Sequence, residues 1–289
     1  MFLMLTATGL ALITVFTFAA RLWWAFDLFS HFRLQYVLAA LVLGIIALSV
    51  RAYGSAAVLA AVALVHGAVL KDLWLGGTAS AAPGGVPLRL VSANVLAHNR
   101  TPEKVLEFVR AADPDLVLLV DIRGRDWREV LGQLRELYPH HAQQAWRARA
   151  RVVLLSRWPI VFEQIREAPR SSRPYLVAKL AVEGRTLDVV GVHPSSPSPS
   201  QPGNTRRRNH ELDHIAEVVK DTDAAVIVAG DFNTTPWSPQ FGDLLAAAGL
   251  RNAAAGKGYV PTWPTWFWPA RIPIDHVLLK GPLAATAVR

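Results

Sequence analysis

Apolar residues run almost without interruption through the first part of the chain, up to about residue 75. Residues 2–20, 34–50 and 52–70 contain no Asp, Glu, Lys or Arg. Each segment is near the minimum length that crosses the hydrocarbon core of a membrane. The pattern predicts a membrane anchor over residues 1–75 with three transmembrane helices and a tight turn at Arg51. A secretory signal peptide is the competing interpretation of the first segment, but no basic residue precedes it and two further apolar segments follow.

Residues 76–87 differ from both of their neighbours. Their sequence, GGTASAAPGGVP, is uncharged and rich in Gly and Pro. Such a composition is typical of a flexible linker at a domain boundary. The remaining residues, 88–289, are therefore expected to form one folded domain.

Shorter apolar runs mark the elements of this domain. Strands are predicted at residues 88–95, 116–120, 151–156, 175–182, 186–192, 224–229 and 274–280. Helices are predicted at residues 102–112, 124–138, 206–220 and 240–248. The domain is thus expected to be a mixture of strands and amphipathic helices.

Composition narrows the chemistry. The chain has no cysteine, which excludes disulfides, zinc–thiolate sites and thiol catalysis. Its net charge is +8, and most of this charge lies after the apolar part. A basic domain suits phosphate-bearing substrates or an anionic membrane surface. A generally basic proteome explains the same charge equally well.

Polar side chains follow several predicted strands directly. In chain order they are Asn94, Asp121, His193, and Asp231 with Asn233, while Asp275 opens the last strand. Carboxylates, amides and a histidine that meet at one edge of a sheet can hold a hard cation and a water against a phosphate. Taken alone, the GDFN sequence at 230–233 is equally consistent with an Asx turn that closes a strand. The recurrence of polar residues at strand ends favours a metal-assisted hydrolase.

The motifs around these residues resemble a known family. They are SAN at 92–94, PDLVLLVD at 114–121, VHP at 192–194, GDFN at 230–233 and IDHVLL at 274–279. In this order and spacing they are similar to the endonuclease/exonuclease/phosphatase superfamily. The arrangement of apolar segments, linker and domain looks like its bacterial membrane-anchored branch.

This resemblance implies a fold and a chemistry. The fold would be a four-layer α/β sandwich of two mixed β-sheets flanked by helices, preceded here by the three membrane helices. Asn94 and Asp121 would hold Mg²⁺ or Mn²⁺, and His193 would assist the leaving oxygen. Asp231 and Asn233 would orient the attacking water, and Asp275 would orient the catalytic histidine. The reaction would be in-line attack of water on a phosphodiester or phosphomonoester.

Two departures from the family pattern bear on activity. Asp121 stands where the family usually has Glu, so its carboxylate reaches less far. The family also closes with a strand that carries Ser-Asp-His, and no histidine follows His276 in this chain. The domain at 88–289 is therefore expected to lack its final strand. The alternative function is a weakly active or non-catalytic relative that binds phosphorylated ligands or lipid headgroups at the membrane.

Further candidates concern substrate and location. Arg206, Arg207 and His276 are predicted to bind substrate, although a solvated basic face explains the arginines equally well. The substrate could be a nucleic acid, a phospholipid or a small phosphoester, and the sequence does not distinguish these or determine the oligomeric state. Counting basic residues favours a cytoplasmic domain by a small margin. The aromatic loop at residues 21–33 favours an extracytoplasmic domain on a bacterial plasma membrane, which is the expectation adopted.

Overall fold

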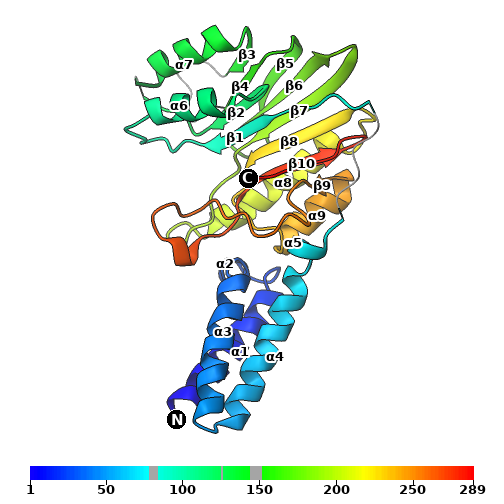
Figure 1. Ribbon diagram of the computed structural model, residues 1–289. Helices are drawn as coiled ribbons and strands as arrows, with labels where there is room; N and C mark the ends of the chain where they lie inside the picture. Colours follow the sequence, from blue (N-terminus) through cyan, green and yellow to red (C-terminus); the bar gives the residue numbers. More distant parts are fainter. Residues whose placement is uncertain (78–83, 125, 144–151) are drawn as a thin grey trace.

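The computed structural model describes residues 1–77, 84–124, 126–143 and 152–289 (Figure 1). Helices come first along the chain: α1 (Phe2–Phe18), α2 (Trp24–Ser30), α3 (Arg33–Ser49), α4 (Tyr53–Leu70) and α5 (Asp72–Leu75). In Figure 1, α1, α3 and α4 lie side by side as an elongated bundle at the N-terminal end of the molecule. Small buried residues, among them Ala7, Ala40 and Ala47, form its centre and let the helices pack closely.

The bundle differs from the three predicted membrane spans. Within the described part of the chain, only the unit Tyr53–Leu75 is, as one helix, long and apolar enough to cross a membrane. α2 and α3 are long enough for a second span only when they are taken together as one helix, and the chain bends by 63° between them. α1 is apolar but has only 17 residues. The predicted number of three spans is therefore not supported, because an uninterrupted apolar sequence does not reveal where a helix bends or ends.

The rest of the molecule is built around two mixed β-sheets. The first has the order β1-β2-β4-β3, with β1 (Leu90–Asn94), β2 (Leu116–Val120), β3 (His140–Gln143) and β4 (Val152–Ser156). The second has the order β5-β6-β7-β8-β10-β9, with β5 (Ile160–Glu167), β6 (Pro174–Val182), β7 (Arg185–Val192), β8 (Ala225–Asp231), β9 (Arg251–Asn252) and β10 (Asp275–Lys280). β1 pairs with β2 in parallel and β7 with β8 in parallel, while the other neighbours run antiparallel.

Helices cover the outer faces of the two sheets. α6 (Glu103–Ala112) and α7 (Asp126–Leu137) pack on the first sheet, and α8 (Gly203–Val219) and α9 (Pro239–Ala248) pack on the second. Three apolar layers result: one between the sheets and one under each pair of helices. The strands of the centre, such as β2, are buried along their whole length, which is why they read as continuous apolar runs. The predicted α/β architecture of two mixed sheets flanked by helices is confirmed.

The helical bundle rests on the second sheet's side of the sandwich. Arg21 forms a two-pronged ion pair with Asp243 of α9, with N–O distances of 2.5 and 2.8 Å. The amide of Gln35 donates to the carbonyl oxygen of Arg271 at 3.0 Å, and the backbone N–H of Gly258 donates to the carbonyl oxygen of Leu73 at 2.8 Å. Six residues of the predicted linker, 78–83, lie outside the described part of the chain. Its role as a flexible tether stays a prediction.

Candidate active site

Six predicted site residues gather where the two sheets meet. They are Asn94 at the end of β1, Asp121 after β2, His193 after β7, Asp231 at the end of β8, Asn233 two residues later, and Asp275 at the start of β10. The parallel pairs β1–β2 and β7–β8 bring their carboxyl ends to the same edge of each sheet. β10 is antiparallel to β8, so its first residue lies opposite the last residue of β8.

Direct contacts join the two sheets at this edge. The side-chain amide of Asn94, from the first sheet, donates to Oδ2 of Asp231, from the second, at 2.8 Å. The same amide nitrogen lies 3.5 Å from Nε2 of His193, and that ring nitrogen lies 3.9 Å from Oδ2 of Asp231. His193 and Asp231 are 8% and 4% exposed, so the group is nearly closed to bulk water. An amide, a carboxyl and an imidazole thus converge on one point.

The turn after β8 is fixed around the carboxyl of Asp231. The backbone N–H of Asn233 donates to Oδ1 of Asp231 at 2.8 Å, and the side-chain amide of Asn233 donates to the carbonyl oxygen of Pro194 at 3.0 Å. Asn233 has a φ of 51°, a left-handed conformation that Asn tolerates better than most residues. The alternative of an Asx turn is therefore realised here, and the functional interpretation of Asp231 and Asn233 stays a prediction. The turn holds the carboxyl, and it also ties the β8 turn to the segment that follows His193.

Asp121 lies beside Asn94 at the end of the first sheet. Its Oδ2 accepts the backbone N–H of Ala97 at 3.0 Å, and Oδ1 of Asn94 accepts the N–H of the preceding residue, Leu96, at 2.9 Å. Asp121 also has a left-handed backbone, with a φ of 61°. Such conformations cost free energy and persist where the surroundings hold them, often at functional sites. The side-chain oxygens of Asn94 and Asp121 are thereby held next to each other by the N–H groups of two consecutive residues.

Asp275 adds a second carboxyl next to Asp231. The two residues are direct partners in the β8–β10 register. Burial, together with the charges of Asp275 and Asp121, raises the pKa of Asp231 to about 8, against hydrogen bonds from Asn94 and Asn233 that lower it. Burial likewise raises the pKa of Asp275, and its Oδ1 is a buried oxygen without a hydrogen-bond partner among the described residues. The site therefore holds more negative groups than its own donors can satisfy.

His193 is held in its neutral form. Burial lowers its pKa to about 4, and the positive charges of Arg173 and Arg123 lower it as well, while Asp121 acts in the opposite direction. A neutral imidazole near pH 7 has one N–H to donate and one nitrogen to accept with. Among the described residues no hydrogen bond joins His193 to Asp275. The predicted role of Asp275 in orienting this histidine stays a prediction.

The residues predicted to bind substrate lie elsewhere. Arg206 and Arg207 are exposed on α8, and Arg207 donates to Oδ1 of Asn204 at 2.8 Å. His276 is 6% exposed, lies 2.8 Å from the carbonyl oxygen of Thr234, and contacts the rings of Phe232 and Phe241. That position gives a substrate no access to its ring, because alternation along β10 turns His276 to the face opposite Asp275.

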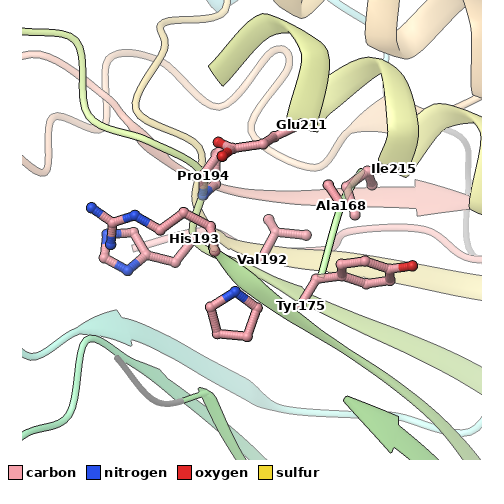
Figure 2. Close-up of a pocket in the computed structure, with 9 residues that line it drawn as sticks. Ala168, Tyr175, Val192, His193, Pro194, Glu211 and Ile215 are labelled. Carbon is pink, nitrogen blue, oxygen red and sulfur yellow. The ribbon is translucent and has the colours of Figure 1, made fainter. Parts of the chain in front are cut away.

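Sequence reasoning missed residues that surround the site. Arg173 and Glu211 line a small pocket beside His193 and Pro194, and Figure 2 shows Glu211 reaching it from α8. Both oxygens of Glu211 are engaged by Ser195, one by its backbone N–H at 2.6 Å and the other by its hydroxyl at 3.0 Å. This buried carboxylate fixes the segment after His193. No strand-end position marks either residue, so the pattern that found the others could not find them.

Arg208 is the third arginine of the run that opens α8, and it is completely buried. Its Nη1 donates to the carbonyl oxygen of Asn233 at 3.1 Å. A sequence signal existed: Arg208 shares the helix face of Glu211, Leu212 and Ile215, which are buried as well. Of the three arginines, Arg208 contacts the site, whereas the sequence predicts this role for Arg206 and Arg207.

Comparisons with known proteins agree with this geometry. The structure resembles TDP2 from Caenorhabditis elegans (TM-score 0.57, 18% identity, 68% of this chain and 85% of that chain covered). It also resembles D. rerio TDP2 complexed with a single-strand DNA product (TM-score 0.58, 19% identity, 70% and 86% covered).

A third similar structure is a β-hairpin deletion mutant of beta toxin from Staphylococcus aureus (TM-score 0.53, 16% identity, 68% and 88% covered). At these identities the likeness concerns the fold. A search among curated proteins gave no match. The sequence profile of the Endonuclease/Exonuclease/phosphatase family matches residues 91–289, which is more than half of the chain. The protein therefore belongs to the Endonuclease/Exonuclease/phosphatase family.

Proposed function

We propose that the protein is a membrane-anchored, divalent-metal-dependent phosphoesterase that hydrolyses a phosphodiester or phosphomonoester by in-line attack of water. The observation that carries this proposal is the contact of Asn94, Asp231 and His193 across the two sheets. Membership of a family whose name describes nucleases and phosphatases gives the same direction. Nucleic acid, phospholipid and small phosphoesters all remain within the proposed substrate class.

The site residues have distinct tasks in this reaction. Asp231 accepts a hydrogen bond from Asn94 and another from the turn, which leaves its carboxyl aimed at the attacking water. With a divalent cation bound nearby, the raised pKa of Asp231 would fall, and the ionised carboxylate could take a proton from that water. The amide of Asn94 and the N–H of His193 supply donors for charge that develops on the phosphoryl and leaving oxygens. Their burial strengthens these interactions, because water does not compete for the same donors.

The acidic groups fit a hard divalent cation held by few protein ligands. Among the described residues no three acidic or histidine side chains are arranged to enclose a metal ion. Asp121 and the carbonyl oxygen of the Asn94 side chain would hold Mg²⁺ or Mn²⁺, with waters completing its shell, as Mg²⁺ prefers. The fit rests on the unpartnered Oδ1 of Asp275 and on the raised pKa of Asp231, both signs of uncompensated negative charge. When bound, the cation would supply a positive charge that stabilises the phosphorane-like transition state.

Metal dependence gives the first test. Purified full-length protein is expected to hydrolyse bis(p-nitrophenyl) phosphate or p-nitrophenyl phosphate with Mg²⁺ or Mn²⁺, and chelation should lower the rate at least about tenfold. Asp121→Asn should raise the metal concentration needed for half-maximal rate, because it removes the charged ligand. Asp221→Asn makes the same chemical change at an exposed position on the loop before β8 and should change nothing.

The opposite result favours the second candidate function. If the wild-type protein turns over neither substrate with either metal, the site does not act as a phosphoesterase on such esters. That alternative is a relative that binds phosphorylated ligands or lipid headgroups, a role for which the net charge of +8 is suited. Direct binding of inorganic phosphate to the wild-type protein, and its loss in Asp121→Asn, would then support it.

We propose further that the helical bundle lies in a bacterial plasma membrane and that the sandwich is extracytoplasmic. The bundle exposes many large apolar side chains, including Leu41, Ile45 and Leu64, which suit a lipid environment. α2, which lies within the aromatic-rich residues 21–33, is at the end of the bundle that faces the sandwich (Figure 1), where an interfacial belt would sit.

Sidedness can be measured because the chain has no cysteine of its own. Ser200→Cys places one thiol on an exposed loop of the sandwich, and Ser49→Cys places one at the exposed opposite end of the bundle. In intact spheroplasts a membrane-impermeant maleimide should label Cys at 200 and should label Cys at 49 only after lysis. The reverse pattern would place the sandwich in the cytoplasm. Equal labelling of both before lysis would contradict a membrane-spanning bundle.

A further inference from the structure

A buried ion pair joins the helical bundle to the sandwich. Nη2 of Arg208, in α8, lies 3.0 Å from Oδ2 of Asp27, in α2. The two side chains are 0% and 5% exposed. Removing both charges from water is costly, and an apolar pair of the same size would hold two elements together at least as well. The charges therefore call for an explanation beyond simple adhesion between the two parts.

The other end of the same guanidinium reaches the candidate active site. Its Nη1 donates to the backbone carbonyl oxygen of Asn233 at 3.1 Å, while its Nε and Nη2 donate to Oδ1 of Asn209. Asn233 in turn donates its backbone N–H to the carboxyl of Asp231. A continuous path of polar contacts thus runs from Asp27 through Arg208 to the turn that aims Asp231.

Further contacts hold the rest of that turn against α2 and the residue after it. Nδ1 of His31 lies 3.0 Å from the hydroxyl of Thr235, and the indole N–H of Trp237 donates to the carbonyl oxygen of His31 at 3.2 Å. The hydroxyl of Ser238 donates to Oδ1 of Asp27 at 3.4 Å. Residues 233–238 are therefore fixed at several points by one short piece of the N-terminal region, residues 27–31.

Other contacts between the two parts of the molecule do not involve the buried charges. The ion pair of Arg21 with Asp243 is largely exposed, with side-chain exposures of 61% and 44%. The apolar contact of Leu70 and Leu73 with Trp237 and Tyr259 carries no charge. These contacts also join the bundle to the sandwich. The buried pair differs from them because its guanidinium ends on the backbone of the turn that holds Asp231.

We propose that Asp27 is a positioning residue: through Arg208 it fixes the carbonyl of Asn233 and so aims Asp231, which makes catalysis depend on docking of the N-terminal helices. The inference rests on the proposed function, since Asp231 is taken as the group that acts on the attacking water. It assigns to the N-terminal region a task in the reaction in addition to membrane attachment.

The test uses the full-length protein in detergent micelles, with variants Asp27→Asn, Arg208→Met, the double variant, and Arg21→Ala as a control. Asp27→Asn is expected to lower kcat for bis(p-nitrophenyl) phosphate about tenfold or more, with KM changed less than about twofold. Arg21→Ala removes an exposed contact between the same two parts and should leave kcat within about twofold of wild type.

The double variant separates positioning from stability. It removes both buried charges, so its thermal stability should recover relative to Asp27→Asn, which leaves the guanidinium unpaired. Its kcat should stay low, because no donor then reaches the carbonyl of Asn233. Recovery of kcat together with stability would overturn the proposal, as would an unchanged kcat in Asp27→Asn.

A second measurement does not need activity. Hydrogen–deuterium exchange should be faster in the peptide covering residues 231–238 in Asp27→Asn than in wild type or Arg21→Ala, because the turn loses its support. If the wild-type protein is inactive on every ester tested, the proposed function fails. The exchange comparison then still tests whether Asp27 supports the turn at residues 231–238. Unchanged exchange in Asp27→Asn would refute the coupling.

Discussion

Replacing Asp231 by asparagine is expected to lower kcat by about 10²-fold or more, the scale of removing a positioned base. Asparagine keeps the shape of the side chain and one of its two acceptor positions. Oδ2 of Asp231 accepts from the amide of Asn94 and Oδ1 accepts from the N–H of Asn233, at 2.8 Å each, and the asparagine NH₂ replaces one of these oxygens. The fold should therefore survive, while the group that takes a proton from water is lost. Steady-state kinetics with Mg²⁺ or Mn²⁺ measure the effect, with Asp221→Asn as the matched control.

The pH dependence of stability checks the same variant without a substrate. The folded-state pKa of Asp231 is raised to about 8, whereas an unfolded aspartate titrates near 4. Between these values the folded protein binds a proton that the unfolded chain releases. Its free energy of unfolding should therefore fall as pH rises through this window, by up to about 1.4 kcal/mol per pH unit for one proton. Asp231→Asn should flatten the slope in metal-free protein, and an equally steep slope in the variant would contradict the assignment.

Replacing Gly230 by alanine should destabilise the protein by about 3 kcal/mol or more, or prevent folding. Gly230 has a φ of 137°, and a Cβ there would lie 2.0 Å from the carbonyl oxygen of Val192. The two residues are partners in the parallel β7–β8 register, so the obstacle is backbone and cannot rotate away. Separating these strands would also move His193 and Asp231 apart. Chemical denaturation measures the loss.

Gly242→Ala is the control for this substitution. Gly242 lies within α9, and nothing within 4 Å would meet an added Cβ. Alanine there should raise stability by about 0.5–1 kcal/mol, because it restricts the unfolded chain and favours helix. If Gly230→Ala were as harmless as Gly242→Ala, the close approach of β7 and β8 would not be a constraint on this fold.

The buried strands and the helices with an apolar face could be predicted from sequence. β2 was predicted with its observed ends, Leu116–Val120, because every residue in it is apolar and its neighbours break the pattern. β3 and β5 were not predicted. Both are outer strands of their sheets: β3 is mostly polar, and β5 mixes apolar and polar residues and is exposed along most of its length. Their pairing depends on partners distant in sequence, which local periodicity does not contain.

The convergence of site residues could be predicted for a different reason. Asn94, His193 and Asp231 follow apolar runs that are too short for helices, and the carboxyl ends of parallel strands share an edge. The structure brings these three into contact, and their catalytic roles stay predictions. His276 illustrates the limit, since being next to Asp275 in sequence places it on the opposite face of β10. Arg208 was visible only as part of a basic run, and nothing local connects it with Asp27.

The full burial of Arg208 limits how this protein can be divided. Its counter-charge, Asp27, belongs to the N-terminal helices. Residues 84–289 joined to a different N-terminal segment would therefore carry the Arg208 cation without its partner, either buried in an apolar interface or exposed to water. The sandwich is therefore not expected to work as an independent domain on a different N-terminal segment. A working chimera would have to bring the segment around Asp27 with it, or replace Arg208 by an apolar side chain and give up the support of the Asn233 turn.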